Sequence, residues 1–131
     1  MKLLLTLFLP LSILFSACQK NEYFEVPNRT IVLNIAPTQW RTADGGKNYS
    51  CSLSMPEITD DFNERGGVLL YLSFGNRTYE QLPEVYDGIA YGYTTSPGQI
   101  ELELQSSSGT GTINPPSQTI TAKVVLVESR Y

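Results

Sequence analysis

Residues 48–55, Asn-Tyr-Ser-Cys-Ser-Leu-Ser-Met, alternate strictly between larger side chains and small polar ones. Tyr49, Cys51, Leu53 and Met55 share one face, while asparagine and serines occupy the other. A period of two over eight residues is the pattern of a β-strand that is buried on one side. This stretch therefore predicts a half-buried strand, and Cys51 is expected to act there as a small hydrophobic side chain rather than as a reactive thiol.

Comparable short segments continue along the chain and are separated by Pro, Gly and Asn turn signals. Further strands are expected at residues 30–35, 68–74, 78–82, 89–94, 99–106 and 119–128. The Ser-, Gly- and Pro-containing stretch at 107–117 is long enough to cross between two sheets. Short strands at regular spacing are typical of sandwiches and barrels, so we expect an all-β fold, an antiparallel two-sheet sandwich of about seven strands with an Ig-like arrangement.

One short helix is expected at residues 58–65. Thr59 suits the N-cap position, and Asp60 and Asp61 favour the first turn, where the helix dipole attracts negative charge. Gly66 and Gly67 then end the helix. The continuous apolar run at 68–74 that follows predicts a strand buried on both faces.

The N-terminus has the pattern of an export signal. Lys2 precedes an apolar run over residues 3–15, and the small residues Ser16 and Ala17 follow before Cys18. This run is shorter than the roughly 20 apolar residues that a membrane-spanning helix needs. A charged start, a short apolar run and small residues at a cleavage site predict a cleaved secretory signal.

Phe15-Ser16-Ala17-Cys18 resembles the bacterial lipobox, in which the cysteine is lipidated and the chain is cut before it. The resemblance implies a lipoprotein signal peptide at 1–17, a lipidated tether at 18–28 and a β-sandwich domain at 29–131. Acyl chains, palmitate among them, on Cys18 would hold the protein to the bilayer, since two or more chains anchor stably. An ordinary cleaved signal or a short N-terminal anchor helix is the alternative.

The expected location is the bacterial cell envelope, at the outer membrane, with the periplasmic and surface sides both open. Residues 19–22, Gln-Lys-Asn-Glu, resemble the short export tags of Bacteroidetes surface lipoproteins. A plain polar tether without an address is the other interpretation of these four residues.

The domain itself resembles a group of small β-sandwich lipoproteins of Bacteroidetes. The segments that carry the resemblance are Pro56-Glu57-Ile58-Thr59, Gly66-Gly67-Val68-Leu69-Leu70-Tyr71, Gln81-Leu82-Pro83 and Lys123-Val124-Val125-Leu126-Val127. These segments are turns and strands rather than catalytic motifs. The resemblance therefore implies a fold and a location, and it implies no activity.

Composition argues against several chemistries. The chain has no histidine, which removes Ser-His-Asp and Cys-His catalysis and His-containing zinc sites. Its net charge is −4 and its basic residues are scattered, so no nucleic-acid partner is expected. Thirteen carboxylates give close pairs by chance, and the acidic run at 60–64 suits a helix start better than a calcium site. We therefore expect no enzyme, no catalytic residue, no metal and no cofactor.

Aromatic side chains are the candidates for ligand binding. Trp40, Tyr79, Tyr86, Tyr91 and Tyr93 fall near the ends of expected strands, where exposed rings could stack on sugars. Core and rim packing uses the same residue types. Two functions stay open: a non-catalytic binding module for a glycan or protein partner, and a structural or accessory subunit of an envelope assembly that pairs through a strand edge.

Overall fold

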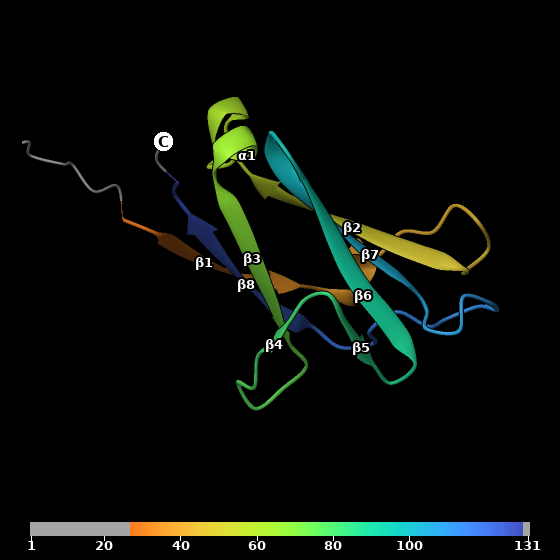
Figure 1. Ribbon diagram of the computed structural model, residues 1–131. Coiled ribbons are helices and arrows are strands. Elements are labelled where there is room, and N and C mark those ends of the chain that lie inside the picture. The colour runs from red at the N-terminus through yellow and green to blue at the C-terminus, as the bar shows by residue number, and fades with distance from the viewer. Residues whose placement is uncertain (1–26, 130–131) are drawn as a thin grey trace, which may run out of the picture.

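In the computed structural model, which describes residues 27–129, two four-stranded antiparallel sheets pack against each other (Figure 1). The predicted all-β sandwich is confirmed. We name the sheets A and B; their strand orders are β1-β8-β3-β4 and β2-β7-β6-β5. The predicted signal peptide, Cys18 and residues 19–22 lie outside the described residues.

Sheet A consists of β1 (Arg29–Ile35), β8 (Ile120–Val127), β3 (Gly67–Ser73) and β4 (Glu80–Gln81). Sheet B consists of β2 (Asn48–Met55), β7 (Gly98–Ser106), β6 (Ile89–Ser96) and β5 (Glu84–Tyr86). A 3-10 helix, η1 (Pro37–Gln39), and an α-helix, α1 (Asp60–Arg65), complete the described elements. The loop after β7 crosses from sheet B to sheet A, as residues 107–117 predict.

The alternation in β2 and β7 builds the inner face of sheet B. These two strands pair antiparallel with Cys51 opposite Leu102 and Leu53 opposite Ile100, so their apolar side chains form matching rows. All four are buried, and they join one core cluster with residues of sheet A such as Leu70. Serines and glutamates on the alternate positions face outward, as the period of two requires.

The prediction that residues 68–74 are buried on both faces is wrong. Leu70 and Leu72 are fully buried, but Leu69 between them is 36% exposed. No helix or strand among the described residues covers the outer face of sheet A, so this face is only partly buried. The strand expected at 78–82 is also shorter than predicted, since only Glu80 and Gln81 pair with β3.

The predicted helix forms beside β3. The Thr59 hydroxyl accepts a hydrogen bond from the backbone N–H of Phe62 at 3.1 Å, which confirms Thr59 as the N-cap. Asp61 and Arg65 form an ion pair one turn apart on the exposed side. Phe62 points into the core and anchors this short helix to the sandwich.

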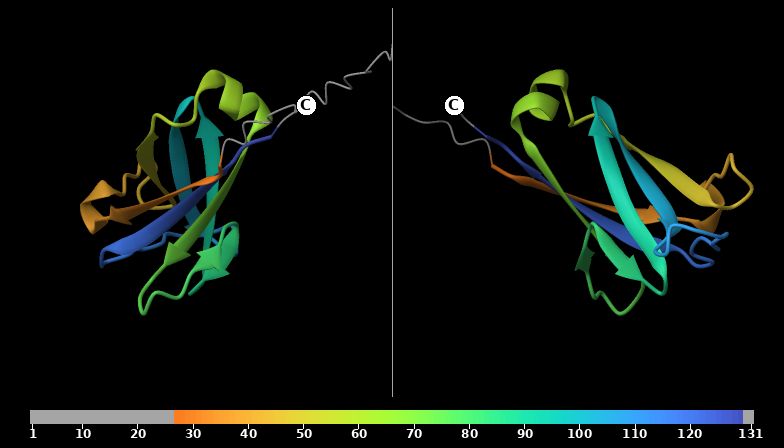
Figure 2. Two further views of the ribbon diagram at one scale, coloured as in Figure 1. Left: turned by 90° about the vertical axis from the view of Figure 1, so that its left-hand side faces the viewer. Right: turned by 45° about the vertical axis from the view of Figure 1, so that its right-hand side comes forward.

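Strand register defines two ends of the sandwich (Figure 2). Arg29 of β1 lies opposite Leu126 of β8, so both described chain ends lie at the end that also holds α1. The loops at 36–47 and 107–119 lie at the opposite end, which we call the loop end. Within residues 27–129, no helix has the length and apolar character needed to cross a membrane.

Gly66 offers a test of the packing at the α1 end. A Cβ at Gly66 would lie 2.5–2.7 Å from three ring carbons of Phe62, whereas a Cβ at Gly67 would meet only Val127 Cβ at 4.0 Å. Because overpacking a core typically costs about 1–3 kcal/mol, we expect Gly66→Ala to lower the free energy of unfolding by that amount. Gly67→Ala is the matched control. Equal denaturation midpoints for the two variants would contradict this packing.

Candidate functional site

The structure places the five predicted aromatic residues in different environments. Trp40 is 5% exposed and Tyr91 is 4% exposed, so both belong to the core. Tyr93 is half-buried, and its hydroxyl donates a 2.6 Å hydrogen bond to the carbonyl of Val68 across the sandwich. The ring faces of Trp40 and Tyr91 are therefore not available for stacking on a sugar.

The other two predicted aromatics lie nearer the surface and have different neighbours. Tyr79 is half-buried, and the ammonium of Lys123 lies 4.2 Å from its ring centroid on sheet A. Tyr86 is 44% exposed and stacks on Phe74, with ring centroids 4.2 Å apart and an interplanar angle of 5°. The five side chains do not gather into one binding surface.

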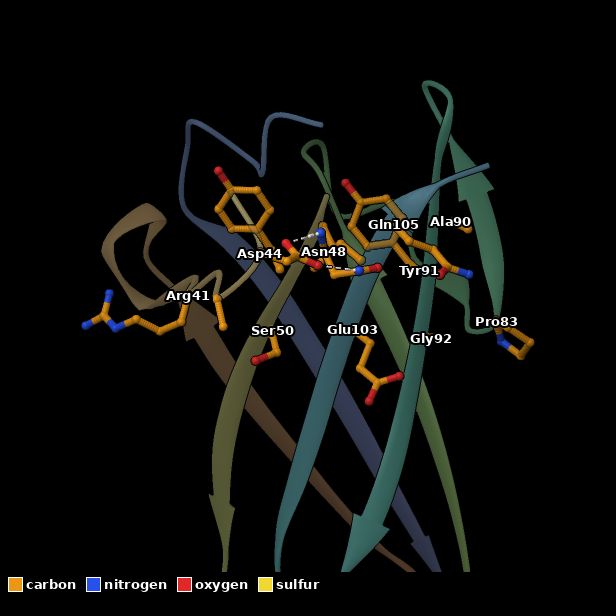
Figure 3. Close-up of a pocket in the computed structure, with 13 residues that line it drawn as sticks. Arg41, Asp44, Asn48, Ser50, Pro83, Ala90, Tyr91, Gly92, Glu103 and Gln105 are labelled. Atoms are coloured by element: carbon orange, nitrogen blue, oxygen red, sulfur yellow. Dashed lines mark hydrogen bonds between the residues drawn. The ribbon is translucent and has the colours of Figure 1, made fainter. Parts of the chain in front are cut away.

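A groove of about 540 Å³ instead runs across sheet B near the loop end (Figure 3). Its centre is a row of directly paired residues: Arg41 bridges to Ser50, Ser50 pairs with Glu103, and Glu103 pairs with Gly92. Paired side chains lie on the same face of a sheet. This row therefore crosses the outer face of sheet B from strand to strand, and Pro83 borders it opposite Arg41.

The floor of the groove is low because two residues of β6 are small. Ala90 and Gly92 face outward between longer side chains, and a Cβ built on Gly92 would meet nothing within 4 Å. Beside them, Gln105 of β7 pairs with both Ala90 and Asn48. The groove is thus an open trough lined by amide, carboxylate, hydroxyl and guanidinium groups.

Asp44 holds the loop that forms one wall of the groove. One carboxylate oxygen accepts hydrogen bonds from the backbone N–H groups of Lys47 and Asn48 at 3.0 and 2.9 Å, and from the Thr42 hydroxyl at 3.0 Å. The other accepts one from the Asn48 side chain at 2.6 Å. The bonds from Asn48 are the main reason that the pKa of Asp44 is lowered to about 2. This carboxylate is already occupied by the protein itself.

Glu103 is the free acid of the groove. Glu103 is exposed, and it forms no ion pair with any of residues 27–129, where the ion pair found is that of Arg65 with Asp61. The guanidinium of Arg41 donates to the carbonyl of Thr38 at 2.5 Å, which directs it along the loop rather than onto Glu103. Glu103 can therefore accept hydrogen bonds from a ligand in the trough. The guanidinium N–H groups of Arg41 that its own loop does not use remain as donors at the border of the groove.

A second polar cluster lies at the corner where the chain passes between the sheets. Glu80 of β4 pairs with Leu72, and Glu84 of β5 pairs with Tyr91; both partners are buried, so both carboxyl groups face inward. One oxygen of each has no hydrogen-bond partner. Burial, followed by the hydrogen bond and the charge of Glu80, raises the pKa of Glu84 to about 7.

The remaining titratable candidates stay within the core or on the helix. Cys51 is buried and unpaired among the described residues, and burial raises the pKa of its thiol, which opposes thiolate chemistry. No group of three or more Cys, Asp or Glu side chains in the described part of the chain is arranged to hold a metal ion. The acidic run at 60–64 lies along α1, with Asp60 and Asp61 in its first turn.

Sequence reasoning missed the groove because its residues come from separate segments. Ser50 was predicted on the outward face of its strand, but its neighbours across the sheet, such as Glu103, were unknown. The usable signal was Ala90 and Gly92, two small residues alternating in an otherwise tyrosine-rich strand. Glycine inside a strand often marks the close approach of a ligand or another backbone.

Comparisons with known proteins add no family assignment. A scan against models of protein families, a search of curated proteins and a search of solved structures each returned no match. The class that the structure supports is therefore the fold alone, an all-β two-sheet sandwich.

Glu84 makes folding stability depend on pH. Its carboxyl group binds its proton more tightly in the folded state than in the unfolded chain, so its stabilising contribution is present below about pH 4.5 and is lost as the pH rises through about 7. We expect Glu84→Gln, which cannot ionise, to raise the melting temperature at pH 8 by a few degrees and to change little at pH 4.5. Glu103→Gln, an exposed acid of the same sheet, is the control. Melting curves of Glu84→Gln that match the native protein at pH 8 would contradict the burial of this pair.

Proposed function

We propose that the chain is a lipid-anchored lipoprotein of the bacterial cell envelope whose sandwich is a non-catalytic binding module for a glycan. The observation that carries the proposal is the polar row on sheet B, in which Ser50, Glu103 and Arg41 line an open trough above Gly92. The proposed ligand site is this trough; of the five aromatic residues suggested by the sequence, Tyr91 alone is among its lining residues.

The chemical groups in the trough suit a hydroxyl-rich ligand. Sugar hydroxyls both donate and accept hydrogen bonds, so they match carboxylate acceptors, guanidinium donors and amides that do both. Asn48, Glu103 and Gln105 are exposed on adjacent strands and supply these groups. The low floor over Ala90 and Gly92 leaves room for a sugar ring to approach the sheet backbone.

The position of the groove also suits a tethered protein. The described chain enters at the α1 end, whereas Asn48, Gln105 and Ala90 lie at the loop end of their strands. If Cys18 is lipidated, the tether joins the domain at the end opposite the groove. The attachment of the tether then leaves the groove open to an extended ligand.

A binding role fits the groove better than hydrolysis does. Glycosidases use two carboxyl groups on opposite sides of the scissile bond. Of the two acids that line the trough, Asp44 is held by four hydrogen bonds of its own loop and Glu103 alone is free. A single free carboxylate can bind a ligand, but a glycosidase mechanism needs a second free carboxyl group, which the lining of the trough does not provide.

The anchor can be tested by metabolic labelling. Cells that express the full-length chain and are fed a tagged fatty acid should label the native protein, and Cys18→Ala should abolish the label because it removes the sulfur that would be acylated. Cys51→Ala, which removes a buried thiol, is the matched control and should keep the label. Labelling that persists in Cys18→Ala would refute lipidation at this residue.

The groove can be tested by filling its floor. Gly92 has an ordinary extended backbone and open space above it, so Gly92→Val should fold normally while its side chain occupies the trough. We expect this variant to bind glycans that the native full-length protein retains on a polysaccharide array at least about tenfold more weakly, a change of roughly 1.4 kcal/mol.

Thr94→Val is the control for this experiment. Thr94 faces outward from the same strand two residues further on, and it does not line the groove. If Gly92→Val and Thr94→Val both retain the same glycans as strongly as the native protein does, the ligand binds elsewhere. An array with no retained glycan at all would overturn the glycan assignment.

A further inference from the structure

The sandwich has four strand edges, and three of them are protected against pairing with another chain. A strand at the edge of a sheet has backbone N–H and C=O groups that pair with no neighbouring strand. Native proteins keep such edges from pairing with other chains by short edge strands, charged side chains or covering segments. The edge strands β4 and β5 are two and three residues long. The edge of β2 is bridged at Ser50 by Arg41 through two 2.8 Å backbone hydrogen bonds, and its outward side chains are Asn48 and three serines.

The fourth edge, β1, has none of these protections. It is a regular strand of seven residues that pairs with β8 on one side, and the described residues provide no backbone partner on its other side. Figure 1 shows it at the border of sheet A. Its only charge, Arg29, is at its first residue, and the prolines at 27 and 37 lie outside the strand. Val32, at its midpoint, is 57% exposed.

We propose that β1 pairs with β1 of a second copy of this chain, antiparallel and with Val32 on the two-fold axis. This partner goes beyond the proposed glycan site and does not depend on it. A two-fold interface requires a surface that complements itself. Seven residues centred on Val32 meet that requirement, because the strand then pairs along its whole length with no overhang.

The resulting side-chain pairs are chemically matched over the five central positions, 30–34. Val32 meets Val32, Thr30 meets Asn34, and Ile31 meets Leu33, so apolar side chains pair with apolar ones and a hydroxyl pairs with an amide. Arg29 falls opposite Ile35, which places the two guanidinium groups at opposite ends of the strand pair, roughly 20 Å apart by strand rise. No like charges meet across the interface. The two copies of sheet A would become one continuous sheet of eight strands.

The proposed anchor is compatible with this geometry. In an antiparallel pair the two Arg29 residues lie at opposite ends, so each tether leaves on its own side. Residues 18–28 can span roughly 36–40 Å when extended, which exceeds that separation. Tethering both copies to one membrane would also raise their effective concentration.

The register can be tested by disulfide trapping of the full-length protein in membranes of expressing cells. Directly opposed Cβ atoms lie about 4.5–5.5 Å apart, close enough for a disulfide. Val32→Cys should give a disulfide-linked dimer under mild oxidation. Thr30→Cys and Asn34→Cys should each stay monomeric alone and form a mixed dimer when they are expressed together. The native chain, which contains Cys18 and Cys51, shows how much disulfide-linked dimer forms without an introduced cysteine.

A charge variant gives an independent measure. We expect Val32→Lys, added to the Thr30→Cys and Asn34→Cys pair, to lower the mixed-dimer yield several-fold, because two ammonium groups would meet on the axis. Val85→Lys is the control, since Val85 is 62% exposed on β5 of the other sheet. Melting curves would establish that both variants fold.

Three outcomes would overturn the proposal. Absence of the Val32→Cys dimer would exclude pairing about Val32, and equal dimer yields from all three single variants would indicate random collision. A cross-linked product of another mass would show that the edge binds a different protein. None of these outcomes bears on glycan retention, so failure here and failure of the groove would be told apart.

Discussion

The rest of the structure depends on burying one face of each sheet against the other. Residues such as Leu53 and Leu102 from sheet B join Leu70 and Val124 from sheet A in a single core, and all four are almost inaccessible to solvent. Burying one aliphatic side chain of this size is worth about 1.5–3 kcal/mol relative to leaving it exposed. Because strand side chains alternate, this packing leaves the opposite face of each sheet free, and the groove occupies one of those free faces.

The outer faces of the two sheets differ in chemistry, because the strands carry different residues at the outward positions that alternate with their core residues. On sheet B the outward positions of β2 and β7 are mostly Ser, Glu and Gln, which suits water and hydroxyl-rich ligands. On sheet A the outward positions include Val32 and Leu69, with Lys123 lying between the rings of Tyr71 and Tyr79. The polar face carries the proposed ligand groove, and the more apolar sheet carries the unprotected edge.

Much of the fold was predictable because local patterns and the tertiary structure agree. The strand at 48–55 has the expected bounds, and Thr59 caps the expected helix. The expectation for 68–74 was wrong because an apolar run does not reveal whether a sheet is covered on one side or two. Leu69 is partly exposed because no helix or strand among residues 27–129 covers the outer face of sheet A. The strand β5 was not predicted, since Glu84–Tyr86 is too short for a periodicity to appear.

The sequence by itself determined the all-β class, the inward and outward sides of the alternating strand at 48–55, and the lack of histidine side chains, because period-two alternation and residue content are local properties. Only the tertiary structure decided which outward residues become neighbours. Arg41, Ser50, Glu103 and Gly92 are far apart in the chain and meet through strand pairing. The same holds for Trp40 and Tyr91, whose rings are buried in the core. Aromatic rings serve in cores as well as at surfaces, so the local sequence pattern does not reveal which rings pack inward.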